Sequence, residues 1–198
     1  MSGPEDVMFS PAVMAEQTRL GSRAQFDGRE FKSEITDDLR QFLAVIDTFF
    51  FATASADGRP YVQHRGGPPG FLKPIGTHML AFADFAGNRQ YVTTGNLAEN
   101  PRAMLFLMDY QHRRRVKIWG QARVVEDDPE LIARLFPDDY RARPEAAILF
   151  TVEAWDANCP QHIPQMLFAE DVAAAIDVLE KRIAALEAEN ARLRGAMA

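Results

Sequence analysis

Hydrophobic side chains form short runs between Thr48 and Asp156, and several of these runs alternate with polar side chains. The runs are rich in aromatic and β-branched residues and are separated by turn residues, which is typical of strands. Six strands are expected, near 48–55, 60–65, 77–83, 102–109, 113–126 and 147–156. Helical patterns are few beside them, so the fold class is expected to be mainly β with flanking helices.

Three short helices are expected where a capping side chain precedes a helical pattern: after Ser10, after Thr36 and after Asp128. Ser10 and Asp128 are each followed by proline, which suits the first helical position. The helix after Thr36 carries an apolar face that we expect to pack on the sheet.

A heptad repeat begins at Val172. Ile176, Ile183 and Asn190 fall at a, while Val172, Leu179, Leu186 and Leu193 fall at d. The pattern predicts a C-terminal heptad helix over residues 169–198, separate from a barrel domain over residues 1–168, and is typical of a coiled-coil seam.

The charges beside this seam favour two parallel copies of the helix. Arg182 at g would face Glu187 at e of a partner, and Glu189 would face Arg194 in the same way. Asn190 at an a position favours a parallel two-stranded register, because two facing amides can bond each other. The alternative is an amphipathic helix that packs on its own barrel.

The composition fits one globular domain with an appendage. The chain has 198 residues, 47% of them hydrophobic, and a formal net charge of −6, which argues against nucleic-acid or anionic-membrane partners. We recognise neither a secretory signal nor a membrane-spanning run, and the single Cys159 cannot form an intrachain disulfide. A cytoplasmic protein is expected. The four histidines lack metal-ligand spacing, so no metal site is expected.

Candidate chemistry first appears after the 77–83 strand. Gly87, Asn88, Arg89 and Gln90 follow it at an expected helix start, where free backbone N–H groups and a guanidinium come together. These are the parts of an anion site, most simply a phosphate site. The alternative is a solvated arginine at a helix start.

The 60–65 strand follows an Asp57-Gly58 turn, which predicts a hairpin. Alternation places Tyr61, Gln63 and Arg65 on one face, and Val62 and His64 on the other. One polar face of this strand therefore meets something other than an apolar core.

Taken together, these segments and the later Asn158-Cys159-Pro160-Gln161-His162 segment resemble the pyridoxamine 5′-phosphate oxidase-like family of flavin-binding split barrels. The likeness covers Phe9 to Pro164. It implies a six-stranded split β-barrel of the FMN-binding type. It also implies FMN as cofactor, a homodimer with the flavin at the subunit interface, and a small-molecule substrate.

By this resemblance, the expected cofactor-binding residues are Gln63, His64, Arg65, Gly66, Gly67, Asn88, Arg89, Gln90, Asn96, Arg115, Lys117, Trp155, Gln161 and His162. Arg89 and Gln90 match phosphate-binding positions, and residues 64–67 match positions that line the isoalloxazine ring. His162 is the one candidate catalytic residue, as a general acid. The alternatives are structural roles for His64 and His162, and a proline-shaped loop from Gly66 to Gly70.

Arg115 and Lys117 occupy a strand in which the family usually has a glutamine and an arginine around a valine. Arginine replaces that glutamine, so Arg115 would stabilise the anionic reduced ring or contact the phosphate. The alternative is a surface ladder against acidic neighbours. Alternation places Arg113, Arg115 and Lys117 opposite Arg114, so this run is not a continuous basic stripe for nucleic acid.

The chain departs from the true oxidase, because its Arg-x-x-Leu-Leu-Lys segment and its C-terminal Arg-Leu-His signature are not recognisable here. Vitamin B6 oxidation is therefore not expected. The expected function is an FMN-dependent oxidoreductase that acts on an unidentified small organic substrate. One alternative is a non-catalytic, redox-sensing flavoprotein that signals through its C-terminal helix, and another is a related barrel that binds deazaflavin F420 or haem.

Overall fold

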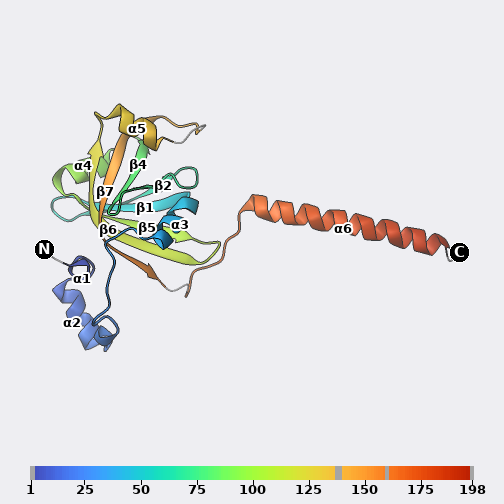
Figure 1. Cartoon of the computed structure of the whole chain (residues 1–198), viewed down its shortest axis with the longest axis horizontal. Helices are drawn as coiled ribbons and strands as arrows, with labels where there is room; N and C mark the ends of the chain where they lie inside the picture. Colours follow the sequence, from blue (N-terminus) through green and yellow to red (C-terminus); the bar gives the residue numbers. More distant parts are fainter. Residues whose placement is uncertain (1–2, 137–139, 159–160, 197–198) are drawn as a thin grey trace. The chain divides into compact units, whose positions relative to one another are not determined.

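The computed structural model describes residues 3–136, 140–158 and 161–196. It divides into two compact units, residues 1–109 with 114–160 and residues 110–113 with 161–198. A sheet and its flanking helices make up the first unit, and one long helix dominates the second (Figure 1).

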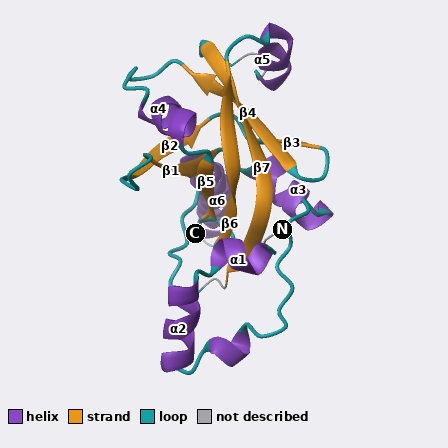
Figure 2. Cartoon of the chain, turned by 90° about the vertical axis from the view of Figure 1, so that its left-hand side faces the viewer, coloured by secondary structure: helices purple, strands orange, loops and turns teal. Residues whose placement is uncertain are grey.

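The first unit is built on one antiparallel sheet with the strand order β2-β1-β5-β6-β7-β4-β3 (Figure 2). The strands are β1 (Thr48–Ala54), β2 (Pro60–Gly66), β3 (Lys73–Ile75), β4 (Met79–Phe85), β5 (Arg102–Asp109), β6 (Arg114–Val125) and β7 (Pro144–Asn158). All six expected strands are therefore present, and the mainly β fold with flanking helices is confirmed.

The expected number of strands is wrong, because β3 adds a seventh. This strand has only three residues, and Pro74 at its centre has no backbone N–H to donate, so the sequence does not predict a strand here. It pairs with β4 and forms one edge of the sheet, while β2 forms the other. The described sheet is open, not a closed six-stranded barrel.

Strand register separates a core face of the sheet from an outer face. Phe49 on β1 lies opposite Leu107 on β5, which lies opposite Val116 on β6, and all three side chains are buried. Burial of each such side chain contributes about 1.5–3 kcal/mol. Arg65 also lies opposite Phe49, so it belongs to the core face, whereas Arg115 is one residue out of step and belongs to the outer face.

Local capping explains the three expected helices, α2 (Pro11–Arg19), α3 (Asp37–Val45) and α5 (Pro129–Leu135). The side chains of Ser10, Thr36 and Asp128 each accept a hydrogen bond from the backbone N–H three residues later. Helix α3 buries Leu39, Phe42 and Leu43 in the main core. The short α1 (Pro4–Met8) and the 3-10 turn Arg23–Gln25 lack such strong signals.

The helix expected at Gly87–Gln90 begins later, as α4 (Val92–Glu99). Arg89 and Tyr91 have φ angles of 59° and 52°, and this left-handed backbone cannot belong to a right-handed helix. Residues 86–91 therefore form a loop between β4 and α4. The expectation that Arg89 lies at a helix start is wrong for this reason.

The second unit contains α6 (Ala169–Ala196), a continuous helix of 28 residues. The segment before α6 is hydrogen-bonded to the turn at residues 110–113. The Gln165 side chain donates to the carbonyl of Gln111, and the Met166 N–H donates to the carbonyl of Tyr110. The expected C-terminal helix is thus present. Among the described residues, no helix combines the length and apolar character that a membrane span requires.

Candidate functional site

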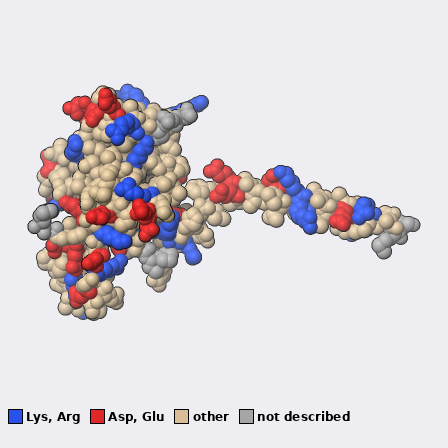
Figure 3. Space-filling view, in the orientation of Figure 1, with Lys and Arg blue, Asp and Glu red and all other residues tan. Residues whose placement is uncertain are grey.

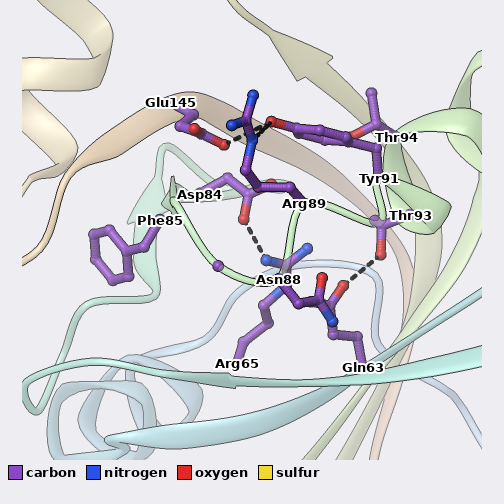
Figure 4. A pocket seen from close by; sticks show the side chains of 11 residues that line it. Gln63, Arg65, Asp84, Phe85, Asn88, Arg89, Tyr91, Thr93, Thr94 and Glu145 are labelled. Carbon is purple, nitrogen blue, oxygen red and sulfur yellow. Dashed lines mark hydrogen bonds and ion pairs between the residues drawn. The ribbon is translucent and has the colours of Figure 1, made fainter.

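A polar hollow that is open to solvent lies where β2, β4, β7 and α4 meet (Figure 4). It is lined by Gln63, Arg65, Asp84, Phe85, Gly87, Asn88, Arg89, Tyr91, Thr93, Thr94 and Glu145. Alternation aims Gln63 and Arg65 at it from β2, and the 86–91 loop supplies Asn88 and Arg89. These segments are far apart in the sequence, and the folding of the sheet brings them together.

The floor of the hollow is an ion pair between Arg65 on β2 and Asp84 on β4 (Figure 4). The side chains are only 12% and 17% exposed. Burial raises the pKa of Asp84, the charge of Arg65 opposes that rise, and the nearby Glu145 adds to it. Asp84 is therefore easier to protonate than an ordinary aspartate.

Arg65 also carries an unused donor. Its Nε is buried and has no hydrogen-bond partner within the described structure. A buried donor left unpaired costs about 1–3 kcal/mol, so such an atom indicates a missing acceptor.

Arg89 reaches the rim of the hollow from the loop. Its Nε donates to the hydroxyl of Tyr91 at 3.3 Å, and that hydroxyl donates to Glu145 at 3.4 Å. The hydrogen bond to Tyr91 is the main cause of a raised pKa for Arg89, with a further contribution from Glu145. The guanidinium is fully exposed and stays cationic, so it is accessible to an incoming anion.

Two further hydrogen bonds hold the walls in place. The Thr93 hydroxyl donates to Gln63 Oε1 at 3.0 Å and so ties α4 to β2. The side-chain oxygen of Asn88 accepts from the Gln90 backbone N–H at 3.1 Å, which shapes the loop. These two bonds hold polar groups in place on α4, on β2 and in the 86–91 loop.

Only part of the expected residue set meets at this hollow. Gln63, Arg65, Asn88 and Arg89 line it, whereas Gln90 contributes a backbone contact to the loop. Asn96 is buried and donates to Thr53 at 3.0 Å, so its amide joins α4 to β1. Sequence reasoning did not single out Asp84, Thr93 or Glu145, although a core-facing Arg65 itself signals that an acidic partner is needed.

His64 and the glycines after it have structural partners. His64 points away from Gln63 and Arg65 and bonds the Thr48 hydroxyl. A Cβ on Gly67 would lie 2.6 Å from Cγ of Phe71, so this glycine allows close packing against the core. At Gly66 a Cβ would meet the His64 ring at 3.2 Å. These contacts agree with a structural role for His64 and for the glycines of the loop that follows it.

A second cationic group lies on the outer face of β6. Arg115 Cζ lies 6.0 Å from the ring centroid of Phe106, and Lys117 Nζ lies 5.9 Å from that of Trp119. Burial, and then the charge of Arg115, lower the pKa of Lys117, while Asp156 opposes this. The Nε of Arg115 is the other buried side-chain atom without a partner in the described part of the chain.

Arg113 does not share this face, contrary to expectation. Strand β6 begins at Arg114, and Arg113 lies in the preceding turn with a φ of 52°. Arg114 bonds Asp109 instead of extending a basic surface.

Trp155 lies beside a different hollow, with Arg29, Phe31, Lys32 and Asp156. Its indole N–H donates to the carbonyl of Glu34 at 2.8 Å, and Lys32 Nζ lies 5.5 Å from the ring centroid. Both the edge and one face of the ring are therefore engaged.

Three further positions complete the set that the sequence singled out. Gln161 and His162 belong to the second unit, where both are exposed and His162 has a φ of 63°. Cys159 lies outside the described residues. Among the described residues, no group of three or more His, Cys, Asp or Glu side chains is arranged to hold a metal ion.

Residues 35–159 match the family model described as Pyridoxamine 5′-phosphate oxidase. HupZ from Group A Streptococcus is similar in structure, with 14% identity, a TM-score of 0.52 and coverage of 67% of this chain and 99% of its own. An FMN-binding protein from Syntrophomonas wolfei shares 12% identity, with a TM-score of 0.48 and coverage of 75% and 95%. Comparison with curated proteins found no match. Since the family model matches more than half of its length, the chain belongs to the pyridoxamine 5′-phosphate oxidase family.

Proposed function

We propose that this member of the pyridoxamine 5′-phosphate oxidase family binds FMN and transfers electrons to or from a small organic substrate. The observation that carries the proposal is a pair of buried donors, Arg65 Nε and Arg115 Nε, for which the described residues offer no acceptor. Both belong to residues at which the family resemblance implies flavin contacts. FMN has phosphate and ring oxygens that supply acceptors of the kind these donors lack.

The phosphate fits best at the polar hollow. Arg89 offers an exposed guanidinium, and Arg65 offers its unused Nε–H. Asp84 and Glu145 would repel a phosphate, but Arg65 neutralises Asp84 and the raised pKa of Asp84 eases its protonation. The hollow therefore tolerates an added negative charge.

The flavin ring fits best at the outer face of β6. Phe50, Phe106 and Trp119 supply partly exposed aromatic surface there, and Arg115 and Lys117 supply positive charge. Burial, and then the neighbouring charge of Arg115, lower the pKa of Lys117, so an acceptor placed beside these two cations would favour its charged form. Bound FMN supplies the redox chemistry, and these two cations would stabilise its ring when it is reduced and anionic.

The two orphan donors also support a homodimer. Arg65 is on the core face at edge strand β2, whereas Arg115 is on the outer face of central strand β6. One flavin would contact both arginines most simply if it bound between two copies of the chain, with the outer face of β6 from one copy next to the polar hollow of the other. The flavin would then lie at the interface, and two-fold symmetry would create two equivalent sites.

The substrate is proposed only as a small organic molecule. The phosphate clamp of the true oxidase is not recognisable in the sequence, so a vitamin B6 phosphate is not the proposed substrate. His162 remains a candidate general acid by resemblance alone.

A redox-sensing role without turnover is the second candidate. The observation in its favour is α6, whose apolar side chains are exposed and would suit a partner that responds to the flavin. Haem is less well supported, because His64 and His78 are engaged with Thr48 and the carbonyl of Ser33 and neither lines the polar hollow. F420 would be distinguished by its own absorption and mass.

The test begins with an absorption spectrum of the purified protein, before and after reconstitution with FMN, and mass identification of any pigment that heat releases. We expect a two-band flavin spectrum with FMN at one per chain. A protein that stays colourless after reconstitution would overturn the flavin proposal.

Arginine-to-lysine variants then test the two donors, because lysine keeps the positive charge but lacks Nε–H. We expect Arg65→Lys and Arg115→Lys each to weaken FMN binding by about tenfold or more in a fluorescence titration. Arg59→Lys is the matched control, since Arg59 is highly exposed in the β1–β2 hairpin and pairs with Asp57. If both variants bound FMN with unchanged affinity, neither Nε–H group would be an FMN contact.

A further inference from the structure

The apolar residues of α6 form a stripe that the described second unit leaves exposed. The d residues Val172, Leu179, Leu186 and Leu193 and the a residues Ile176 and Ile183 are between 39% and 62% exposed. Their heptad spacing places them along one side of a continuous helix that is about 42 Å long. A stripe of this length and regularity needs a partner with the same period.

We infer that α6 pairs in parallel and in register with α6 of a second copy of this chain. This inference goes beyond flavin binding and does not depend on it. The occupant is identified by charge complementarity beside the stripe and by the polar residue within it.

Two of the charges that flank the stripe, Arg182 and Glu187, have no oppositely charged residue three or four positions away in their own helix. Arg182 has only apolar residues at the positions three and four residues away, and Glu187 has Ala184, Asn190, Ile183 and Ala191 at the equivalent positions. By contrast, Lys181 on the outer side of α6 bonds Asp177 of the same helix at 2.6 Å. Figure 3 shows such charged groups interspersed along the helix. Arg182 and Glu187 are instead spaced to meet across a parallel pair, as g and e of successive heptads.

Orientation follows from comparing the two ways in which two copies could overlap. Parallel pairing joins Arg182 to Glu187 and Glu189 to Arg194 of the other copy, twice each by symmetry, and places Asn190 against Asn190. Antiparallel pairing over the full length places Glu180 beside Glu187, which is repulsive, and Arg182 beside Glu189, which is attractive, and it packs Asn190 against Leu179. The parallel arrangement has four attractive contacts and satisfies both amides, so it is favoured.

Disulfide trapping in the full chain tests both pairing and direction. In a Cys159→Ser background, Leu193→Cys introduces a thiol at a d position, and Ala188→Cys introduces one at f on the outer side. We expect mild oxidation to link two Leu193→Cys chains at least ten times faster than two Ala188→Cys chains. Antiparallel helices would hold the two 193 positions roughly 25 Å apart, so slow linkage at 193, or equal rates at both positions, would overturn the inference.

A charge exchange separates helix pairing from other causes of proximity. Arg182→Glu should slow disulfide linkage at 193, and adding Glu187→Arg should restore it, because the pair is rebuilt with its charges exchanged. Failure of the double variant to recover would overturn the g–e assignment. FMN content per chain is measured in the same samples, so loss of linkage with retained FMN would refute helix pairing alone, while absent FMN with intact linkage would refute the proposed function alone.

Discussion

The sheet of the first unit and α6 of the second satisfy their apolar residues in different ways. Phe51, Phe82 and Leu105 are completely buried among side chains of the same unit. The apolar stripe of α6 is exposed along its whole length, and its residues are spaced for another helix. The difference teaches that one chain can combine a core buried within its own unit with a helix whose apolar side chains stay exposed, and we propose a second copy of α6 as their partner.

The first unit also contains two different arrangements of charged side chains. The Arg65–Asp84 pair balances its charge internally and is largely shielded from solvent. On the outer face of β6, burial and then the neighbouring charge of Arg115 lower the pKa of Lys117, so two cations lie close together there. We place the flavin ring beside the two outer-face cations, and its phosphate at the hollow, beside the exposed Arg89.

The largest expected effect sharpens the contrast between core and helix. Phe82→Ala should lower the free energy of unfolding by about 3–5 kcal/mol, because the ring is fully buried and contacts Phe49, Phe51 and Phe71 edge-on. Urea denaturation measures this loss. Leu186→Ala, at a site 42% exposed, is the control and should leave the sheet transition unchanged; equal losses in the two variants would contradict the contrast.

Arg89→Ala should weaken FMN binding by roughly tenfold to a hundredfold, because the variant removes a charged contact to the phosphate. Far-UV circular dichroism and urea denaturation should match the wild type, since the side chain is exposed and donates a hydrogen bond to Tyr91, only two residues away. Arg59→Ala serves as the matched exposed arginine. A variant that keeps full affinity for FMN would exclude Arg89 from phosphate binding.

A smaller loss tests how far local capping supports the sheet. Thr36→Ala removes the oxygen that accepts from the Leu39 N–H, and should cost about 1 kcal/mol of unfolding free energy. Thr36→Ser retains that oxygen and should recover most of the loss. If the serine variant were as unstable as the alanine variant, the cap would not be the cause.

The smallest effect is a pH dependence at the polar hollow. Because burial raises the native pKa of Asp84, its stabilising contribution is complete below the ordinary aspartate pKa of about 3.9 and is lost as the pH rises through the native pKa. Wild-type stability relative to Asp84→Asn should therefore fall as the pH rises across that window. Urea midpoints at a series of pH values measure this difference, and parallel profiles for the two proteins would refute the assignment.

The sequence by itself determined the elements that depend on near neighbours. Ser10, Thr36 and Asp128 cap helices within three residues, and alternation correctly places Gln63 and Arg65 on one face of β2. These features are readable because a cap or a period of two involves residues that are adjacent in the chain.

Only the tertiary structure decided what those elements meet. Strand β3 forms despite Pro74 because β4 offers it an edge, and the left-handed φ angles at Arg89 and Tyr91 delay α4 until Val92. The polar hollow requires Asp84 and Glu145, which reach Arg65 and Arg89 through pairings among distant strands. Local propensity does not specify such pairings, because the packing of the whole core selects the register and determines which polar groups are buried together.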